Sequence, residues 1–183
     1  SVTGIGSYAF QDCSSLTSVS IPNSVTDFGY RMFYNRCWPE SVFWDTNIQT
    51  SCFDDYSKAQ IKELIYGDNV SIVYPFFSRC TKLAKVVLGK TVSQLRTEAF
   101  KDTHITEFHI TGIEPPICYP NVFQNVELDN ATLYVPAEKQ EYYQTTEPWS
   151  KFGSLVAEEA GMTQIEIGEK ESSSFYTLDG KKV

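Results

Sequence analysis

Pairs of apolar residues recur along this chain, and in each pair the two residues lie two positions apart. That spacing is the period of a β-strand with one buried face. Successive pairs are about 23 residues apart, which is too long for a hairpin connection and suits strands stacked in parallel. The pattern therefore predicts six short strands, around the pairs Val19/Ile21, Val42/Trp44, Leu64/Tyr66, Val86/Leu88, Phe108/Ile110 and Leu133/Val135.

A phenylalanine precedes each pair and keeps the same rhythm. These anchor residues, separated by 23, 20, 24, 23 and 23 positions, are Phe10, Phe33, Phe53, Phe77, Phe100 and Phe123. A fixed period of 20–50 residues is the signature of a repeat architecture, in which each unit buries its apolar face only against its neighbours. We therefore expect the anchors to be structural residues rather than the lining of a ligand pocket.

The first repeat has the pattern V-T-x-I-G-x-x-A-F-x-x-C-x-x-L-x-x-V-x-I-P-x-S, beginning at Val2. It resembles the BspA-like leucine-rich repeat family of bacterial surface proteins, and residues 91–100 match it again. The repeat containing Phe53 departs most, and residues 54–63 are expected to form a short helix on the convex side. The resemblance covers roughly residues 1–156. It implies an α/β-type leucine-rich repeat solenoid that is β-dominated: a right-handed coil with a parallel concave sheet of about six short strands.

Two segments follow the last predicted strand. Residues 136–156 are expected to cap the array, with a short helix over residues 137–144 and an apolar stripe of Trp149, Phe152 and Leu155 laid over the last coil. The array with its cap then spans residues 1–156. Residues 157–183 are expected to form an extension with a β-hairpin.

Charge and composition narrow the classes of function. The 183 residues carry a formal net charge of −8 at pH 7, which disfavours binding to nucleic acid. The chain contains no apolar run of the roughly 18 residues that could span a membrane. Ser1 falls inside a repeat, so we expect an export signal to precede it, with room for further repeats. The resemblance implies an extracellular or cell-surface location.

Residues that could carry chemistry are few. The chain has no recognisable nucleophile, phosphate-binding or metal-binding motif, so we expect no enzyme activity, no cofactor and no metal. Its two histidines flank Glu107, and a metal site would need a third ligand that the sequence does not supply. The five cysteines are an odd number without a CxxC pair. We expect small buried thiols; disulfides between stacked repeats are the less favoured alternative.

The informative surface is the concave face of the predicted sheet. The residues between the inward ones form two outward rows. The first contains charges of alternating sign, Glu63, Lys85 and Glu107. The second is unusually apolar for a solvent-facing row and contains Phe43, Ile65, Val87, His109 and Tyr134. Such a row can simply reflect strand preference and stacking along the ladder. The alternative, which we adopt as a hypothesis, is that both rows contact a partner.

The sequence leaves several functions open. The resemblance implies a non-catalytic adhesion module that binds a host or cell-surface protein through the concave sheet. A glycan-binding or accessory module of a larger surface enzyme or complex is an alternative, for which Phe43 and Tyr134 are the concave aromatic candidates. A third is a scaffold that spaces another domain from the cell. We expect a monomer.

Overall fold

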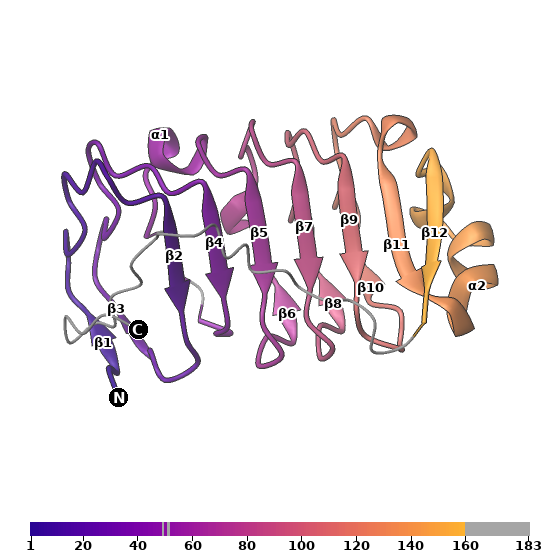
Figure 1. The fold of residues 1–183 in the computed structure, drawn as a ribbon, viewed down its shortest axis with the longest axis horizontal. Coiled ribbons are helices and arrows are strands. Elements are labelled where there is room, and N and C mark those ends of the chain that lie inside the picture. Colours follow the sequence, from indigo (N-terminus) through magenta and orange to yellow (C-terminus); the bar gives the residue numbers. More distant parts are fainter. Residues whose placement is uncertain (49, 51, 160–183) are drawn as a thin grey trace.

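The computed structural model describes residues 1–48, 50 and 52–159. Its main element is a seven-stranded parallel sheet in which strands follow one another in sequence order (Figure 1). These strands are β2 (Ser18–Ile21), β4 (Ser41–Trp44), β5 (Glu63–Tyr66), β7 (Lys85–Leu88), β9 (Glu107–Ile110), β11 (Thr132–Pro136) and β12 (Ser154–Glu158). Residues expected in a hairpin beyond Glu159 lie outside the described part of the chain.

The strand register agrees with the predicted repeat. Val42 pairs with Val19 on one side and Leu64 on the other, so the Trp38-Pro39-Glu40 insertion does not shift the strand. The inward row continues through Val86, Phe108 and Leu133, as the spacing of apolar residues predicted; Val42, Leu64, Val86, Phe108 and Leu133 have no exposed surface. The face opposite this row is called the outer face below.

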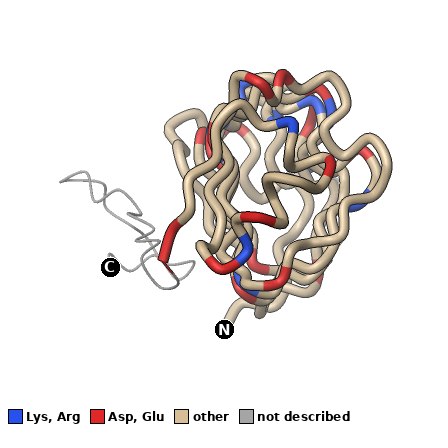
Figure 2. The backbone as a smooth tube through the Cα atoms, turned by 90° about the vertical axis from the view of Figure 1, so that its right-hand side faces the viewer, with Lys and Arg blue, Asp and Glu red and all other residues tan. Residues whose placement is uncertain are grey.

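Shorter elements build the rest of each coil. A three-stranded parallel sheet is formed by β6 (Ile72–Val73), β8 (Gln94–Leu95) and β10 (Ile117–Cys118), and a two-stranded one by β1 (Gly4–Ile5) and β3 (Asp27–Phe28). The helical pieces are α1 (Asp55–Lys58), α2 (Gln140–Thr145) and the 3-10 turns η1 (Pro75–Phe77), η2 (Leu128–Asn130), η3 (Ala137–Lys139) and η4 (Trp149–Lys151). Viewed along the stack, the coils superpose and charged residues lie around their outside (Figure 2).

The core is a stack of the anchor phenylalanines. Phe33 lies between two parallel rings, with its centroid 4.9 Å from that of Phe10 and 4.4 Å from that of Phe53. Phe100 and Phe123 stack in the same way at 5.8 Å. All anchors are buried except Phe10, which is half-buried because its ring is stacked on one side only. The structural role predicted for the anchors is thereby confirmed.

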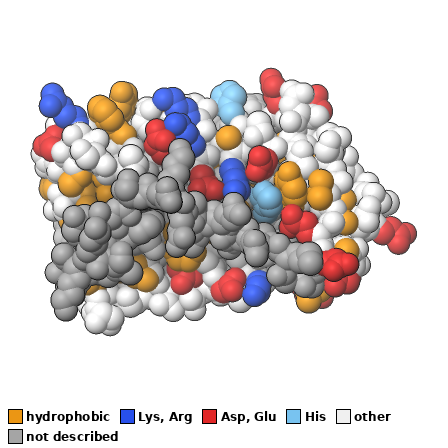
Figure 3. All heavy atoms as spheres, viewed as in Figure 1, with side chains coloured by type: hydrophobic (Ala, Val, Ile, Leu, Met, Phe, Trp, Pro, Cys, Tyr) orange, Lys and Arg blue, Asp and Glu red, His pale blue; other side chains and the backbone are white. Residues whose placement is uncertain are grey.

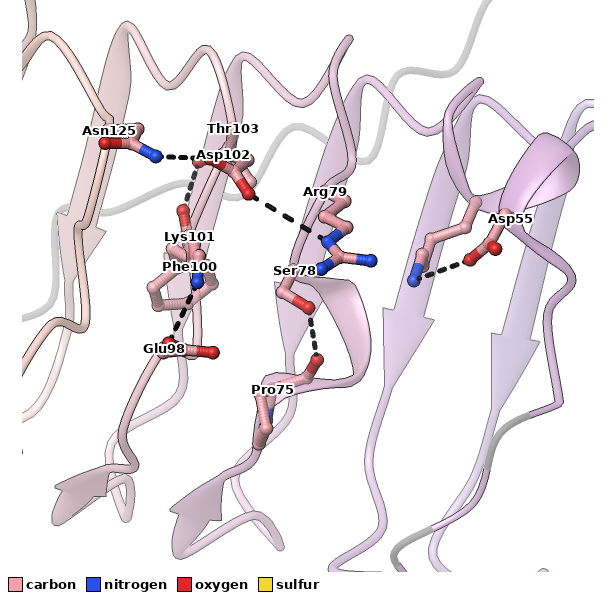
Figure 4. Close-up of polar contacts among 11 residues, drawn as sticks. Asp55, Pro75, Ser78, Arg79, Glu98, Phe100, Lys101, Asp102, Thr103 and Asn125 are labelled. Atoms are coloured by element: carbon pink, nitrogen blue, oxygen red, sulfur yellow. Dashed lines mark hydrogen bonds and ion pairs between the residues drawn. The ribbon is translucent and has the colours of Figure 1, made fainter.

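The backbone on both sides of the anchors adopts the left-handed conformation. Positive φ occurs two residues before the anchor at Tyr8, Arg31, Glu98 and Asn121, and two residues after it at Asp12, Asn35, Arg79, Asp102 and Asn125. Asn and Asp tolerate this conformation better than most residues. Their side chains also join neighbouring coils: Asn125 donates to Asp102 at 2.7 Å and Asn35 to Asp12 at 2.8 Å. Arg79 extends the first of these ladders, with Nε 3.9 Å from Oδ2 of Asp102 (Figure 4).

The cap differs in part from the expectation. Its helical segment comprises η3 followed by α2, close to the predicted residues 137–144. Trp149 is buried with 2% of its surface exposed, and Phe152 packs half-buried against Phe123. Leu155 also packs against the core, as expected, but it is not part of the helical segment of the cap. It lies in a seventh strand, β12, opposite Leu133, and this strand runs to Glu158, two residues past the expected end of the array.

Candidate recognition surface

One row of side chains crosses all seven strands on the outer face. We call it the apolar row: Ser20, Phe43, Ile65, Val87, His109, Tyr134 and Val156, each paired with the next in the sheet register. The members that the sequence predicted fall into one row in the predicted order. Exposure varies along the row: Ile65 and Val87 have 6% and 3% of their surface exposed to solvent, whereas Val156 has 40% exposed. Phe43, His109 and Tyr134 are half-buried. The accessible surface of the row therefore lies mainly at these half-buried members and at Val156, while Ile65 and Val87 form its buried middle.

A polar row runs beside the apolar row, two residues earlier in each strand. Its charged members are Glu63, Lys85 and Glu107, which occupy adjacent strands as predicted. Lys85 Nζ lies 3.2 Å from Glu63 Oε1, and Ser41 Oγ donates to Glu63 Oε2 at 3.0 Å. Both partners of the ion pair retain about a third of their side-chain exposure, so the pair adds little stability. Figure 3 shows acidic, basic and histidine side chains beside hydrophobic ones on this face. The charges of this row therefore contribute little to the stability of the sheet.

His109 joins the two rows. Its ring stacks on that of Tyr134, with centroids 4.0 Å apart and planes 6° from parallel. Nε2 lies 3.5 Å from Oε2 of Glu107, an ion-pair distance but without hydrogen-bond geometry, and Nδ1 also has no partner within the described residues. Burial, assisted by the nearby Lys85, lowers the pKa of His109 from its usual value, against the opposing effect of Glu107 and Glu158. The imidazole is therefore held mainly neutral at pH 7, and it offers a polar edge to a partner without a full charge.

The sequence prediction missed the part of this surface that β12 supplies. Ser154 extends the polar row and Val156 the apolar row. A signal for the strand exists: Leu155 follows Leu133 by 22 residues, the interval between other strands of the array, and the short apolar run of residues 155–157 is consistent with a strand. The helical segment that precedes these residues resembles a cap, and in the sequence residues 154–158 therefore look like a continuation of that cap.

The remaining reactive groups do not form a second site. The five cysteines are free thiols. Burial raises the pKa of Cys37, Cys52, Cys80 and Cys118 to about 12, so these thiols are poor nucleophiles. Among the described residues, no three His, Cys, Asp or Glu side chains gather in a way that could hold a metal ion. In the same part of the chain, no helix is long and apolar enough to cross a membrane.

A hollow of about 780 Å³ lies between the last coils and the cap, lined by residues 118–124 and by parts of residues 126–129 and 147–151. Its ionisable side chains include Lys151 and Glu147, which pair with each other at 3.0 Å. Cys118, the thiol in its lining, has the raised pKa described above. The hollow thus combines no activated nucleophile with a base.

One strand per coil, parallel stacking and a recurring apolar anchor define a leucine-rich repeat solenoid. Residues 1–106 match the BspA type leucine rich repeat region in six copies, and the chain belongs to this family. Members are typically found in bacterial surface or exported proteins, and leucine-rich repeat domains are typically non-catalytic and generally mediate protein interactions.

A solved structure of a leucine-rich repeat protein from Bacteroides ovatus is similar, with 23% identity and a TM-score of 0.47. The match covers 85% of this chain and 46% of that protein, so this chain spans less than half of its length. No curated protein matches the sequence.

Proposed function

We propose that this chain is a non-catalytic recognition module of an exported bacterial surface protein, and that it binds a host or cell-surface protein through the outer face of the seven-stranded sheet. The observation that carries the proposal is the apolar row, which crosses every strand of the sheet on the side opposite the core. Phe43, Ile65, Val87 and Tyr134 neither belong to the hydrophobic core nor pack against its edge, so packing of the core does not account for this row.

The polar row and the apolar row make different contributions to binding. Phe43, Tyr134 and the stacked His109 supply apolar and aromatic contact area, with Ile65 and Val87 beneath a partner that covers the middle of the row. The charged side chains of Glu63, Lys85 and Glu107 set its orientation, because wrongly placed charges are penalised as contacts form. Aromatic side chains near the centre of an interface commonly provide most of its binding energy.

The test is binding to immobilised human extracellular-matrix proteins, measured beside a glycan array. The variant Phe43→Ser/Tyr134→Ser removes the half-exposed aromatics of the row. Ile113→Ser is the matched control, because Ile113 is 54% exposed and lies outside the apolar row. We expect the wild type and the control to bind a matrix protein equally, and the double variant to lose at least about tenfold in affinity.

Two results would overturn the proposal. Unchanged binding by the double variant would remove the outer face as the site. Binding confined to the glycan array would favour the alternative of a glycan-binding module.

A further inference from the structure

Three tyrosines and an arginine, two of them exposed and two half-buried, lie together away from the outer face, on the turns of the first two coils. We call this group the tyrosine cluster: Tyr8, Tyr30, Arg31 and Tyr34. The ring of Tyr8 meets Tyr30 edge-on at 6.1 Å and Tyr34 at 5.8 Å. The guanidinium carbon of Arg31 lies 5.0 Å from the ring centroids of both Tyr30 and Tyr34. Tyr8 and Tyr30 are 42% and 58% exposed. Four side chains from two coils thus form one ordered surface.

The core does not require these aromatics. None of the four residues belongs to the hydrophobic core or packs against it from the edge. Tyr8 and Arg31 occupy the left-handed position two residues before the anchor, which Glu98 and Asn121 occupy in later coils. At φ 60° the backbone of a tyrosine is strained, whereas the equivalent position of the sixth coil is occupied by Asn121, a residue type that tolerates this conformation better. Local stability therefore does not account for the cluster.

Arg31 is positioned but not neutralised. Two ring faces hold its guanidinium, and no ion pair with a carboxylate is formed to it within the described residues. The nearby carboxylate of Asp12 is engaged instead by the amide groups of Asn35 at 2.8 Å and Gln11 at 3.2 Å. A guanidinium fixed in this way presents a fork of N–H donors that matches a carboxylate.

We propose that the tyrosine cluster binds a sugar that carries a carboxylate, with Arg31 pairing with the acid group. The phenol rings offer apolar faces to the sugar C–H groups, while their hydroxyls can hydrogen-bond to its hydroxyls. The net charge of −8 disfavours a densely charged acidic peptide, whereas one carboxylate on an otherwise neutral ring is repelled much less. This site is separate from the outer face and does not depend on it.

The experiment titrates the chain with the methyl glycosides of glucuronic and galacturonic acid, with methyl glucoside and methyl galactoside as their respective neutral counterparts. Binding is followed by NMR, through shifts of the tyrosine ring and Arg31 side-chain signals. Arg31→Gln removes the charge, and Tyr30→Ala removes a ring. Arg96→Gln is the matched control, because Arg96 lies 4.6 Å over the single ring of Tyr119 in another coil.

At least one acidic glycoside is expected to bind. Its neutral counterpart and the Arg31→Gln and Tyr30→Ala variants should be weaker by at least about tenfold, while Arg96→Gln binds as the wild type does. The proposal is overturned if no acidic glycoside shifts these signals at millimolar concentration, or if Arg96→Gln weakens binding as much as Arg31→Gln. Tighter binding of an Asp/Glu-rich heptapeptide at the cluster would replace the sugar with a protein ligand.

Discussion

Stability should depend on where in the stack an anchor ring is removed, and Phe33 and Phe10 allow a direct comparison. Phe33 has no exposed surface and stacks on rings at 4.9 and 4.4 Å, whereas Phe10 is half-buried and has one stacked neighbour. Truncating a fully buried Phe to Ala costs about 3–5 kcal/mol. Because Phe33 is stacked on both faces, Phe33→Ala belongs at the upper end, about 4–5 kcal/mol. Phe10 is only partly buried and is stacked on one face, so Phe10→Ala should cost less, about 2 kcal/mol.

Urea unfolding of the two variants and the wild type measures this difference through the midpoint and the slope m. A gap of about 2–3 kcal/mol corresponds to roughly 5–10 °C between their melting temperatures in a chain of this size. Equal costs for the two substitutions would refute the reasoning, because they would mean that the rings are not stabilised by packing on the coil on each side. A lower m for Phe33→Ala alone would show that the first coils unfold separately from the rest.

Two further predictions concern a glycine and a histidine. Gly29→Ala should lower the free energy of unfolding by about 1–3 kcal/mol, because its Cβ would lie 2.0 Å from the backbone nitrogen of Ser7. Nothing lies within 4 Å of a Cβ at Gly6, so Gly6→Ala should change stability by less than about 1 kcal/mol. Thermal denaturation distinguishes the two variants, and equal shifts in melting temperature would contradict the close approach at Gly29. His109 should destabilise the fold on acidification, because its pKa is lowered in the native state. The unfolded chain therefore binds the proton more readily as the pH falls from 7 through about 6.5. The unfolding free energies at pH 7.5 and 5.5 should differ more in the wild type than in His109→Gln, and an equal difference would contradict the assignment.

The repeat itself was predictable from sequence because each coil presents the same requirement to its neighbours. Burying the equivalents of Phe33 and Val42 in every coil forces a fixed spacing, and that spacing sets the register of the sheet and of both outer rows. The charged members Glu63 and Lys85 could be placed on one face for the same reason, because strand side chains alternate.

Features outside the repeat were not predictable in this way. Nothing in the spacing indicates that Arg31 lies between two tyrosine rings, because the contact joins residues at different positions of the turn and depends on left-handed backbone. The strand β12 escaped prediction because β11 is the last strand that an anchor phenylalanine precedes. The low exposure of Val87 on an outward row likewise could not follow from alternation, which fixes direction and not accessibility.

The order of the strands has a mechanical consequence for a protein held at both ends. Among the described residues, each strand of the main sheet pairs with the strands of adjacent coils, so the hydrogen bonds between coils lie along the direction in which the coils are stacked. Tension applied along that direction acts on the interfaces in series. The weakest interface opens first and releases about 23 residues of chain, while the coils on either side remain folded. Such a chain would lengthen in steps under load rather than fail at once.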